Sequence, residues 1–342
     1  MKTPPSLQKG DKVAIVSPAK KIPAERIENA VNIFEKWELR VSTGKNVLAR
    51  NNYFAGKDED RAADFQEMLD DREVKAIICA RGGYGTVRIL DKLDFSNFVK
   101  NPKWIVGFSD ITALHSHIAR NYQVETIHAP MPLDYGDTED ESVESLRKVL
   151  FGEELSYAFE TKASSRKGQA QGELVGGNLS VLYSLNGSVS DIDTSKKILF
   201  IEEVGENLYH FDRMIQNMKR AGKFENLNGL IVGYISGMKD NNDATAFNKS
   251  PEEIILEAVD EYDFPVCFGF PSGHEKRNLA FIHGRELILN VGEEKSIAEP
   301  HISGKETKPR GIARNLVSIT LMVIGFFLII YLLYSLAIKF LT

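Results

Sequence analysis

The segment Gly107-Phe108-Ser109-Asp110-Ile111-Thr112 places a serine where it could act as a nucleophile. It lies between an apolar run that predicts a strand and a pattern that predicts a helix. The turn should therefore hold Ser109 out at the carboxyl end of a sheet. Backbone N–H groups at the start of the helix could then face a developing oxyanion. The second glycine of the G-x-S-x-G elbow is replaced by Ile111, and Ser-Asp before a helix is also a common N-cap. From this segment alone, a nucleophile and a plain helix cap both stay open.

A second candidate is the glycine-rich turn Arg81-Gly82-Gly83-Tyr84-Gly85, which follows the apolar run Val74–Ala80. Paired glycines let a backbone approach a ligand or donate N–H groups from unusual φ and ψ angles. A phosphate loop is excluded because no G-K-[ST] motif follows. The turn is therefore either a binding element or a tight connection between a strand and a helix.

A serine nucleophile requires a base, and His274 is the best placed of the seven histidines. It lies in Phe270-Pro271-Ser272-Gly273-His274, a loop that follows a predicted strand, and such loops often carry catalytic side chains. His115 and His117 are two residues apart on a predicted helix, so they point to different faces and form a poor metal pair. The sequence alone leaves open whether His274 lies near Ser109.

Carboxylates that could orient the histidine lie in Ile201-Glu202-Glu203-Val204-Gly205-Glu206, at the end of an apolar strand. The chain order Ser, Glu, His matches one of the known triad orders. Because side chains alternate along a strand, Glu202 and Glu203 should point to opposite faces, so only one of them can reach His274. Solvated acids at a strand end are the alternative interpretation.

The N-terminal part of the chain predicts alternating strands and helices that would position these turns. Strands are predicted at Val13–Ser17, Leu39–Val41, Val74–Ala80 and Trp104–Gly107, and helices at Pro23–Trp37, Asp58–Leu69 and Asp110–Arg120. This alternation is typical of a parallel sheet that is covered by helices on both faces.

A second α/β unit is predicted after a polar stretch at 136–172, which we interpret as an inter-domain connection. Its predicted strands are Lys197–Glu202, Gly229–Tyr234, Val266–Phe270 and Glu286–Val291, and one predicted helix is Tyr209–Arg220. Another helix should begin at Ser250-Pro251-Glu252-Glu253, because this segment combines an N-cap serine, a first-turn proline and a capping-box glutamate.

Charge and cysteine content exclude several classes of protein. The 342 residues include 42 Lys and Arg against 48 Asp and Glu, a net charge of −6. An acidic chain argues against nucleic acid as the main partner, since phosphate binding needs clustered basic residues. Two cysteines, Cys79 and Cys267, are too few for a disulfide scaffold and fit a reducing compartment. The first residues lack the apolar run of a secretory signal.

The end of the chain differs in composition from the rest. Residues 299–314 contain four basic and two acidic residues, which predicts a basic linker. Asn315–Ile338 is uncharged and apolar, and as a helix of about 36 Å it would cross a hydrocarbon core of about 30 Å. The sequence therefore predicts one transmembrane helix. Basic residues precede it, so the expected localisation is the cell membrane, single-pass, with a cytoplasmic catalytic body.

The part of the chain before the linker, residues 4–298, resembles the serine LD-carboxypeptidase family. That family includes muropeptide LD-carboxypeptidases and microcin C immunity peptidases. The matching motifs occur in the family's order: Gly10–Pro18, Arg81–Gly85 with Arg88, Gly107–Leu114, Gly176–Leu179, Ile201–Glu203 with Tyr209 and Asp212-Arg213, and Gly273-His274. Glu203 departs from the family pattern, in which Asp commonly follows the catalytic Glu.

The resemblance implies a role for each candidate residue. It makes Ser109 the nucleophile, Glu202 the acid and His274 the base. The residues that it assigns to the oxyanion or the substrate are Gly83, Asp110, Tyr84 and Asn178. It implies no metal and no organic cofactor.

The family also implies the architecture and the reaction. We expect an N-terminal parallel-sheet α/β domain at 1–135 and a C-terminal α/β domain with a small barrel-like sheet at 173–298. The active site would form at their junction. The expected reaction releases terminal D-Ala from a small peptide substrate, the murein tetrapeptide of cell-wall recycling. The alternatives are an immunity-type amidase that hydrolyses an aminoacyl-nucleotide antibiotic, and a non-enzymatic membrane-anchored binder. A homodimer is left open.

Overall fold

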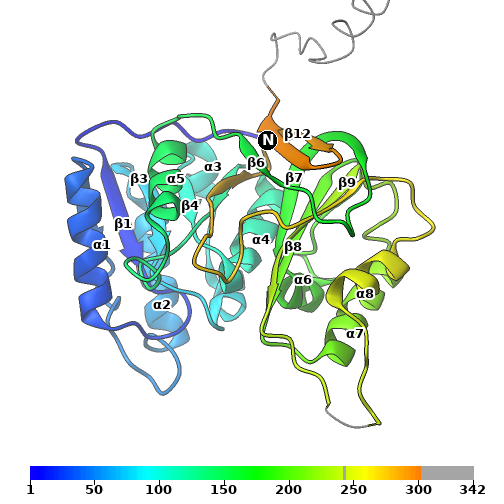
Figure 1. Cartoon of the computed structure of the whole chain (residues 1–342). Coiled ribbons are helices and arrows are strands. Elements are labelled where there is room, and N and C mark those ends of the chain that lie inside the picture. The colour runs from blue at the N-terminus through cyan, green and yellow to red at the C-terminus, as the bar shows by residue number, and fades with distance from the viewer. Residues whose placement is uncertain (242–243, 302–342) are drawn as a thin grey trace, which may run out of the picture. The chain divides into compact units, whose positions relative to one another are not determined.

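The computed structural model describes residues 1–241 and 244–301. Residues 1–301 form one compact unit with a mixed α/β fold, in which two β-sheets are each covered by helices (Figure 1). Figure 1 shows most of the N-terminal sheet and its helices α1 to α3 in blue to cyan, with α5 in green, beside the green to orange strands of the second sheet.

The N-terminal sheet has six strands in the order β11-β5-β4-β3-β1-β2. Its strands are β1 (Lys12–Val16), β2 (Arg40–Thr43), β3 (Val74–Cys79), β4 (Trp104–Val106), β5 (Thr126–His128) and β11 (Phe281–His283). Strands β1 to β5 are parallel, and β11 pairs antiparallel with β5. The parallel strands place the ends of β3 and β4 at one edge of the sheet, where the glycine turn and Ser109 follow them.

Helices cover this sheet because each presents an apolar face at helical spacing. They are α1 (Ala24–Lys36), α2 (Asp58–Asp70), α3 (Ser96–Lys100), α4 (Thr112–Tyr122) and α5 (Asp140–Leu150). In α1, Ile27, Ala30 and Phe34 recur every three or four residues and are all buried. Leu146 and Leu150 of α5 join the same core cluster.

The second sheet has seven strands in the order β10-β9-β8-β7-β12-β13-β6. They are β6 (Tyr157–Glu160), β7 (Gly168–Asn178), β8 (Ile198–Val204), β9 (Gly229–Ser236), β10 (Val266–Phe268), β12 (Glu286–Val291) and β13 (Lys295–Pro300), and its helices are α6 (Leu179–Leu185), α7 (Leu208–Arg220) and α8 (Pro251–Ala258). Strands β7 to β10 are parallel, and the remaining strands pair antiparallel. Helix α8 begins with the predicted capping box of Ser250 and Glu253.

The structure differs from the sequence-based expectation between residues 136 and 172. This stretch was expected to connect two domains, but it contains α5, β6 and the start of β7. Strand β6 alternates Tyr157 and Phe159, which are buried, with exposed residues, and it pairs with β13 at the sheet edge. Four residues are too short for this alternation to stand out from a polar sequence.

The structure does not support the transmembrane part of the expected fold, nor the single-pass membrane localisation that followed from it. Within residues 1–241 and 244–301, the structure has no helix that is both long and apolar enough to cross a membrane. The segment 315–338 and most of the basic linker at 299–314 lie outside the described residues. The fold that the structure supports is therefore the two-sheet α/β unit.

Candidate active site

Ser109 lies in a strained turn between β4 and α4. Its φ angle is +60°, in the left-handed region that non-glycine residues adopt only at a cost of about 1–3 kcal/mol. Gly107, two residues before Ser109, is also at positive φ, and a Cβ placed there would lie 2.8 Å from Ile111 Cγ1. Ile111 thus fills the space that Gly107 leaves, which explains how the turn forms without the second glycine of the elbow motif. The strain favours a functional serine over a plain helix cap, because an N-cap residue has extended φ and ψ.

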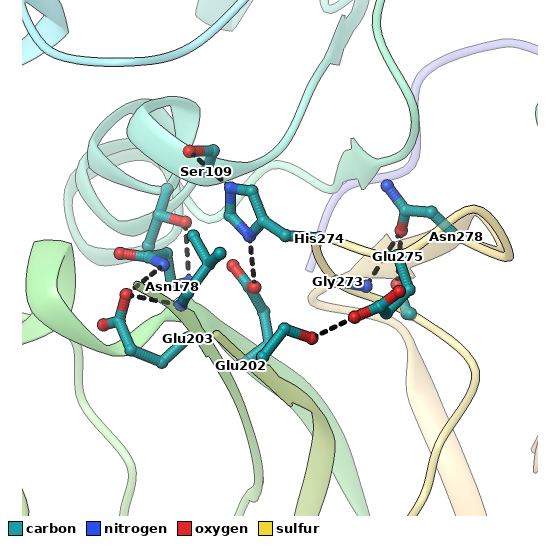
Figure 2. A network of polar contacts seen from close by, with 12 residues as sticks. Ser109, Asn178, Glu202, Glu203, Gly273, His274, Glu275 and Asn278 are labelled. Atoms are coloured by element: carbon teal, nitrogen blue, oxygen red, sulfur yellow. Dashed lines mark hydrogen bonds and ion pairs between the residues drawn. The ribbon is translucent and has the colours of Figure 1, made fainter. Parts of the chain in front are cut away.

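The structure brings Ser109, His274 and Glu202 together in one hydrogen-bonded chain (Figure 2). Ser109 Oγ lies 3.1 Å from His274 Nε2, and His274 Nδ1 lies 2.7 Å from Glu202 Oε2. The three residues come from three separate elements: the β4–α4 turn, strand β8 and the loop after β10. This geometry allows His274 to accept the serine proton while Glu202 holds the imidazole.

The environment of His274 sets its basicity. Burial disfavours its charged form, but the charge of Glu202 and the hydrogen bond to it, with the charges of Glu203 and Asp134, outweigh that effect. The pKa of His274 is therefore raised above its ordinary value. The Glu202 side chain is fully buried, and within the described part of the chain its Oε1 has no hydrogen-bond partner.

Glu203 points away from His274 into a separate network. Its carboxylate accepts hydrogen bonds from Asn178 Nδ2 (3.2 Å) and from the backbone N–H groups of Ser180 (2.7 Å) and Val204 (2.9 Å). Burial raises the pKa of this carboxyl group. A shift in the pairing of β8 with β9 lies between Ile201 and Glu203, and such a bulge re-aims side chains locally. Of these two adjacent acids, only Glu202 is hydrogen-bonded to the histidine.

The loop that carries His274 is fixed by a close approach of its backbone to Glu202. Gly273 has φ of +130°, and a Cβ placed there would lie 3.2 Å from both Cβ and Oε2 of Glu202. The side chain of Asn278 accepts hydrogen bonds from the Gly273 N–H (3.1 Å) and from Ser272 Oγ (3.0 Å). The sequence motif Gly273-His274 therefore has a steric reason, since any larger residue before the histidine would displace the acid.

The glycine turn lies against the serine. A Cβ placed on Gly82 would lie 3.0 Å from Ser109 Cβ and 3.2 Å from Ser109 Oγ. The Asp110 carboxylate accepts the Thr86 N–H at 2.9 Å, and burial raises the pKa of this carboxyl group. The Asp110 side chain thus binds the end of the glycine turn at Thr86, while the backbone nitrogen of Asp110 lies close to Gly82.

The other two residues that the family resemblance singled out occupy different positions. Tyr84 is exposed and packs its ring 6.0 Å from that of Phe54. Asn178 is buried, and its Oδ1 accepts hydrogen bonds from the Ser180 hydroxyl and the Val181 N–H, so it caps helix α6. Its Nδ2 donates to Glu203 (3.2 Å), and its backbone N–H donates to Thr112 Oγ1 at the start of α4 (3.0 Å).

Sequence reasoning missed two residues beside the site. Asp134 follows β5, accepts the Met131 N–H at 2.9 Å and contributes to the raised pKa of His274. Arg61 on α2 is almost fully buried and donates to the carbonyl oxygens of Pro18 and Gly85. A charged residue among the apolar positions of a helix was the only available signal, and it does not show which backbone groups Arg61 contacts.

The remaining histidines do not form a metal site. His115 contacts the carbonyl oxygen of Gly107 at 2.8 Å, and His117 contacts Ser190 Oγ at 2.8 Å. Among residues 1–241 and 244–301, no group of three or more His, Cys, Asp and Glu side chains is placed to hold a metal ion.

A strained serine that is hydrogen-bonded to a histidine, which is in turn hydrogen-bonded to a buried carboxylate, is the arrangement found in serine-type hydrolases. Comparison with known proteins defines the family. Residues 13–129 match the LD-carboxypeptidase N-terminal domain, and residues 171–289 match the LD-carboxypeptidase C-terminal domain. The chain therefore belongs to the LD-carboxypeptidase family and is an enzyme, a serine-type carboxypeptidase.

Individual relatives agree with this assignment over nearly their whole length. The probable murein peptide carboxypeptidase of Bacillus subtilis is 36% identical over 309 residues, 88% of this chain and 95% of the relative. The microcin C7 self-immunity protein of Escherichia coli is 24% identical over 331 residues, 86% of this chain and 95% of the relative. The crystal structure of the muramoyltetrapeptide carboxypeptidase from Oxalobacter formigenes has a TM-score of 0.76 at 26% identity, covering 85% of this chain and 99% of that structure.

Proposed function

We propose that this enzyme hydrolyses the peptide bond that releases terminal D-Ala from murein tetrapeptides, with Ser109, His274 and Glu202 as its catalytic triad. The observation that carries the proposal is the continuous hydrogen-bonded chain from Ser109 Oγ through His274 to Glu202. The murein substrate is supported by the names of the Bacillus and Oxalobacter relatives.

The proposed reaction has two halves. In the first, Ser109 Oγ attacks the carbonyl carbon at the L-configured centre of the diamino acid, and His274 Nε2 takes the serine proton. His274 then gives this proton to the nitrogen of D-Ala as the C–N bond breaks, which leaves an acyl-enzyme on Ser109. In the second half, His274 takes a proton from water, the resulting hydroxide attacks the acyl carbon, and the proton returns to Ser109 as the peptide leaves.

The negative charge on the carbonyl oxygen needs hydrogen-bond donors. We assign the backbone N–H groups of Gly83 and Asp110 to this role, because the glycine turn lies against Ser109. Among the described residues, none accepts a hydrogen bond from the Gly83 N–H, so it is available to a ligand. Tyr84 is exposed at the same turn and would contact the substrate. Asn178 is the last residue of β7 and would help to bind the substrate by holding this strand end in place.

The amidase alternative has less support. Enzymes that hydrolyse an aminoacyl-nucleotide antibiotic are expected to stack an aromatic side chain on the base. Trp104 is 2% exposed and donates its indole N–H to the Pro5 carbonyl oxygen, and Trp37 packs against the core of the N-terminal domain. Trp104 is therefore not available for stacking, and Trp37 is only partly exposed.

A direct assay tests the proposal. The full chain is incubated with a murein tetrapeptide that ends in D-Ala, with the same peptide ending in L-Ala, and with a processed aminoacyl-nucleotide antibiotic. We expect free D-Ala from the first peptide and much slower release from the second. Cleavage of the antibiotic without release of D-Ala would replace our proposal with the amidase function.

The raised pKa of His274 predicts the pH dependence of the reaction. His274 must be neutral to accept the serine proton, so kcat/KM should fall about tenfold per pH unit below the pKa of His274. Because that pKa is raised above its ordinary value, the acidic limb should lie at higher pH than the limb of an unperturbed histidine. In Glu202→Gln the limb should move to lower pH, since the largest influence that raises the pKa is removed. A limb that stays in place in this variant would show that another group titrates.

A further inference from the structure

Lys20 lies at the edge of the active site and is held there by backbone pairing. Its backbone pairs antiparallel with that of Phe54, and the neighbouring Lys21 N–H donates to the Tyr53 carbonyl oxygen at 3.3 Å. The Lys20 ammonium lies 4.8 Å from the centroid of the Tyr53 ring. The two side chains therefore flank the same point on the glycine turn: a Cβ placed on Gly83 would lie 3.1 Å from the Tyr53 hydroxyl and 3.2 Å from Lys20 Cβ.

The other basic side chains around this turn are already engaged. Their partners are the Asn52 carbonyl oxygen for Lys21, the Lys21 carbonyl oxygen for Arg81, the Asp58 carboxylate for Arg88, and Pro18, Gly85 and Asp58 for Arg61. Among the described residues, Lys20 has no carboxylate partner, and its ammonium contacts only the face of the Tyr53 ring. Lys20 is therefore the cation of this group that is available to a ligand.

Ser109 and Lys20 lie against adjacent residues of the glycine turn, a spacing that suits the release of one residue. Gly82 lies against the serine side chain, and the next residue, Gly83, lies against Lys20 and Tyr53. Consecutive Cα atoms are about 3.8 Å apart, so the backbone point that faces Lys20 lies about one residue along the turn from the point that faces Ser109. In a peptide that loses a single terminal amino acid, the terminal carboxylate lies one residue beyond the scissile carbonyl.

The electrostatics of the site also call for a cation at this position. The chain has a net charge of −6, and the carboxylates of Glu202, Glu203 and Asp134 all lie close enough to His274 to raise its pKa. A substrate carboxylate that enters such a site is repelled unless a positive charge faces it. An ammonium on the aromatic face of Tyr53 is held in place without being neutralised.

We propose that the Lys20 ammonium, positioned by Tyr53, binds the terminal carboxylate of the peptide substrate and so restricts the enzyme to the last residue. This inference rests on the proposed function, because it assigns one end of the same substrate. Lys20 is then a specificity-determining residue that contacts the leaving group and takes no part in bond breaking.

The test compares two substrates and matched lysine variants of the full chain. The substrates are the D-Ala-terminated murein tetrapeptide and its C-terminal carboxamide, and kcat/KM is measured from release of D-Ala or D-alaninamide. For Lys20→Met we expect a loss of about tenfold to hundredfold on the free acid, the usual effect of losing a charge-assisted hydrogen bond. On the carboxamide we expect Lys20→Met to have the same kcat/KM as the wild-type enzyme. Lys20→Arg should keep most of the preference for the acid.

Lys21→Met is the matched control, because it removes the neighbouring ammonium, which bonds the Asn52 carbonyl oxygen. It should retain the wild-type preference for the acid. Equal losses on both substrates in Lys20→Met, or no loss on either, would overturn the role of Lys20 while leaving the proposed function intact. If Arg81→Met loses the preference for the free acid and Lys20→Met keeps it, Arg81 and not Lys20 binds the carboxylate. If the wild-type enzyme cleaves neither peptide, the proposed function and this inference both fail.

Discussion

Ser109→Ala should lower kcat by about four to six orders of magnitude and leave the fold intact. Removing a triad nucleophile leaves only the catalysis that binding and oxyanion stabilisation supply. The Ser109 hydroxyl is hydrogen-bonded to His274 Nε2, and the His274 side chain is 21% exposed, so removing the hydroxyl does not leave a fully buried polar group without a partner. Alanine also keeps the strain at φ of +60°, so the free energy of unfolding should change by less than about 0.5 kcal/mol.

This prediction is tested by D-Ala release from the murein tetrapeptide and by urea unfolding of the same samples. Ser184→Ala is the control, because Ser184 is an exposed serine of α6 whose hydroxyl donates to the Val181 carbonyl oxygen. It should retain wild-type activity. If folded Ser109→Ala protein turned over substrate at close to the wild-type rate, the serine mechanism would be wrong.

The parts of the site that could be predicted from sequence depend on local patterns. An apolar run, a glycine and a serine before a helix indicate a strand, a tight turn and an exposed side chain, wherever the rest of the chain lies. Alternation along a strand likewise separates Glu202 from Glu203 without knowledge of their partners. The family resemblance supplied what local patterns could not, the pairing of Ser109 with His274, which are 165 residues apart.

The parts that could not be predicted depend on contacts between distant segments. Strand β11 has three residues and pairs with β5, so Phe281 lies opposite His128 in the N-terminal sheet although it belongs to the C-terminal half of the chain. Strands this short carry no reliable periodicity. The roles of Arg61 and Asn278 could not be predicted for a related reason. Both side chains bind backbone groups whose positions are defined only in the folded chain.

Glu202→Gln should lower kcat about ten-thousandfold, the second largest effect that we expect. The amide keeps the shape of the side chain but cannot stabilise the imidazolium that forms on His274, and it can hold the ring in the wrong tautomer. Glu202 lies 2.7 Å from His274 Nδ1 and is fully buried, so water cannot replace its charge. The measurement is kcat for D-Ala release at a pH above the acidic limb, where His274 is neutral in both proteins.

Glu203→Gln is the matched control, since it makes the same change one residue along the strand. Its carboxylate accepts hydrogen bonds from Asn178 and Ser180 at the start of α6 and from Val204 at the end of β8, so the amide would turn a donor towards N–H groups. We expect kcat within about tenfold of wild type but a loss of roughly 1–3 kcal/mol in the free energy of unfolding. The two variants should thus separate, one losing activity and the other stability. A larger loss of activity in Glu203→Gln than in Glu202→Gln would mean that the acid is assigned one residue out of register.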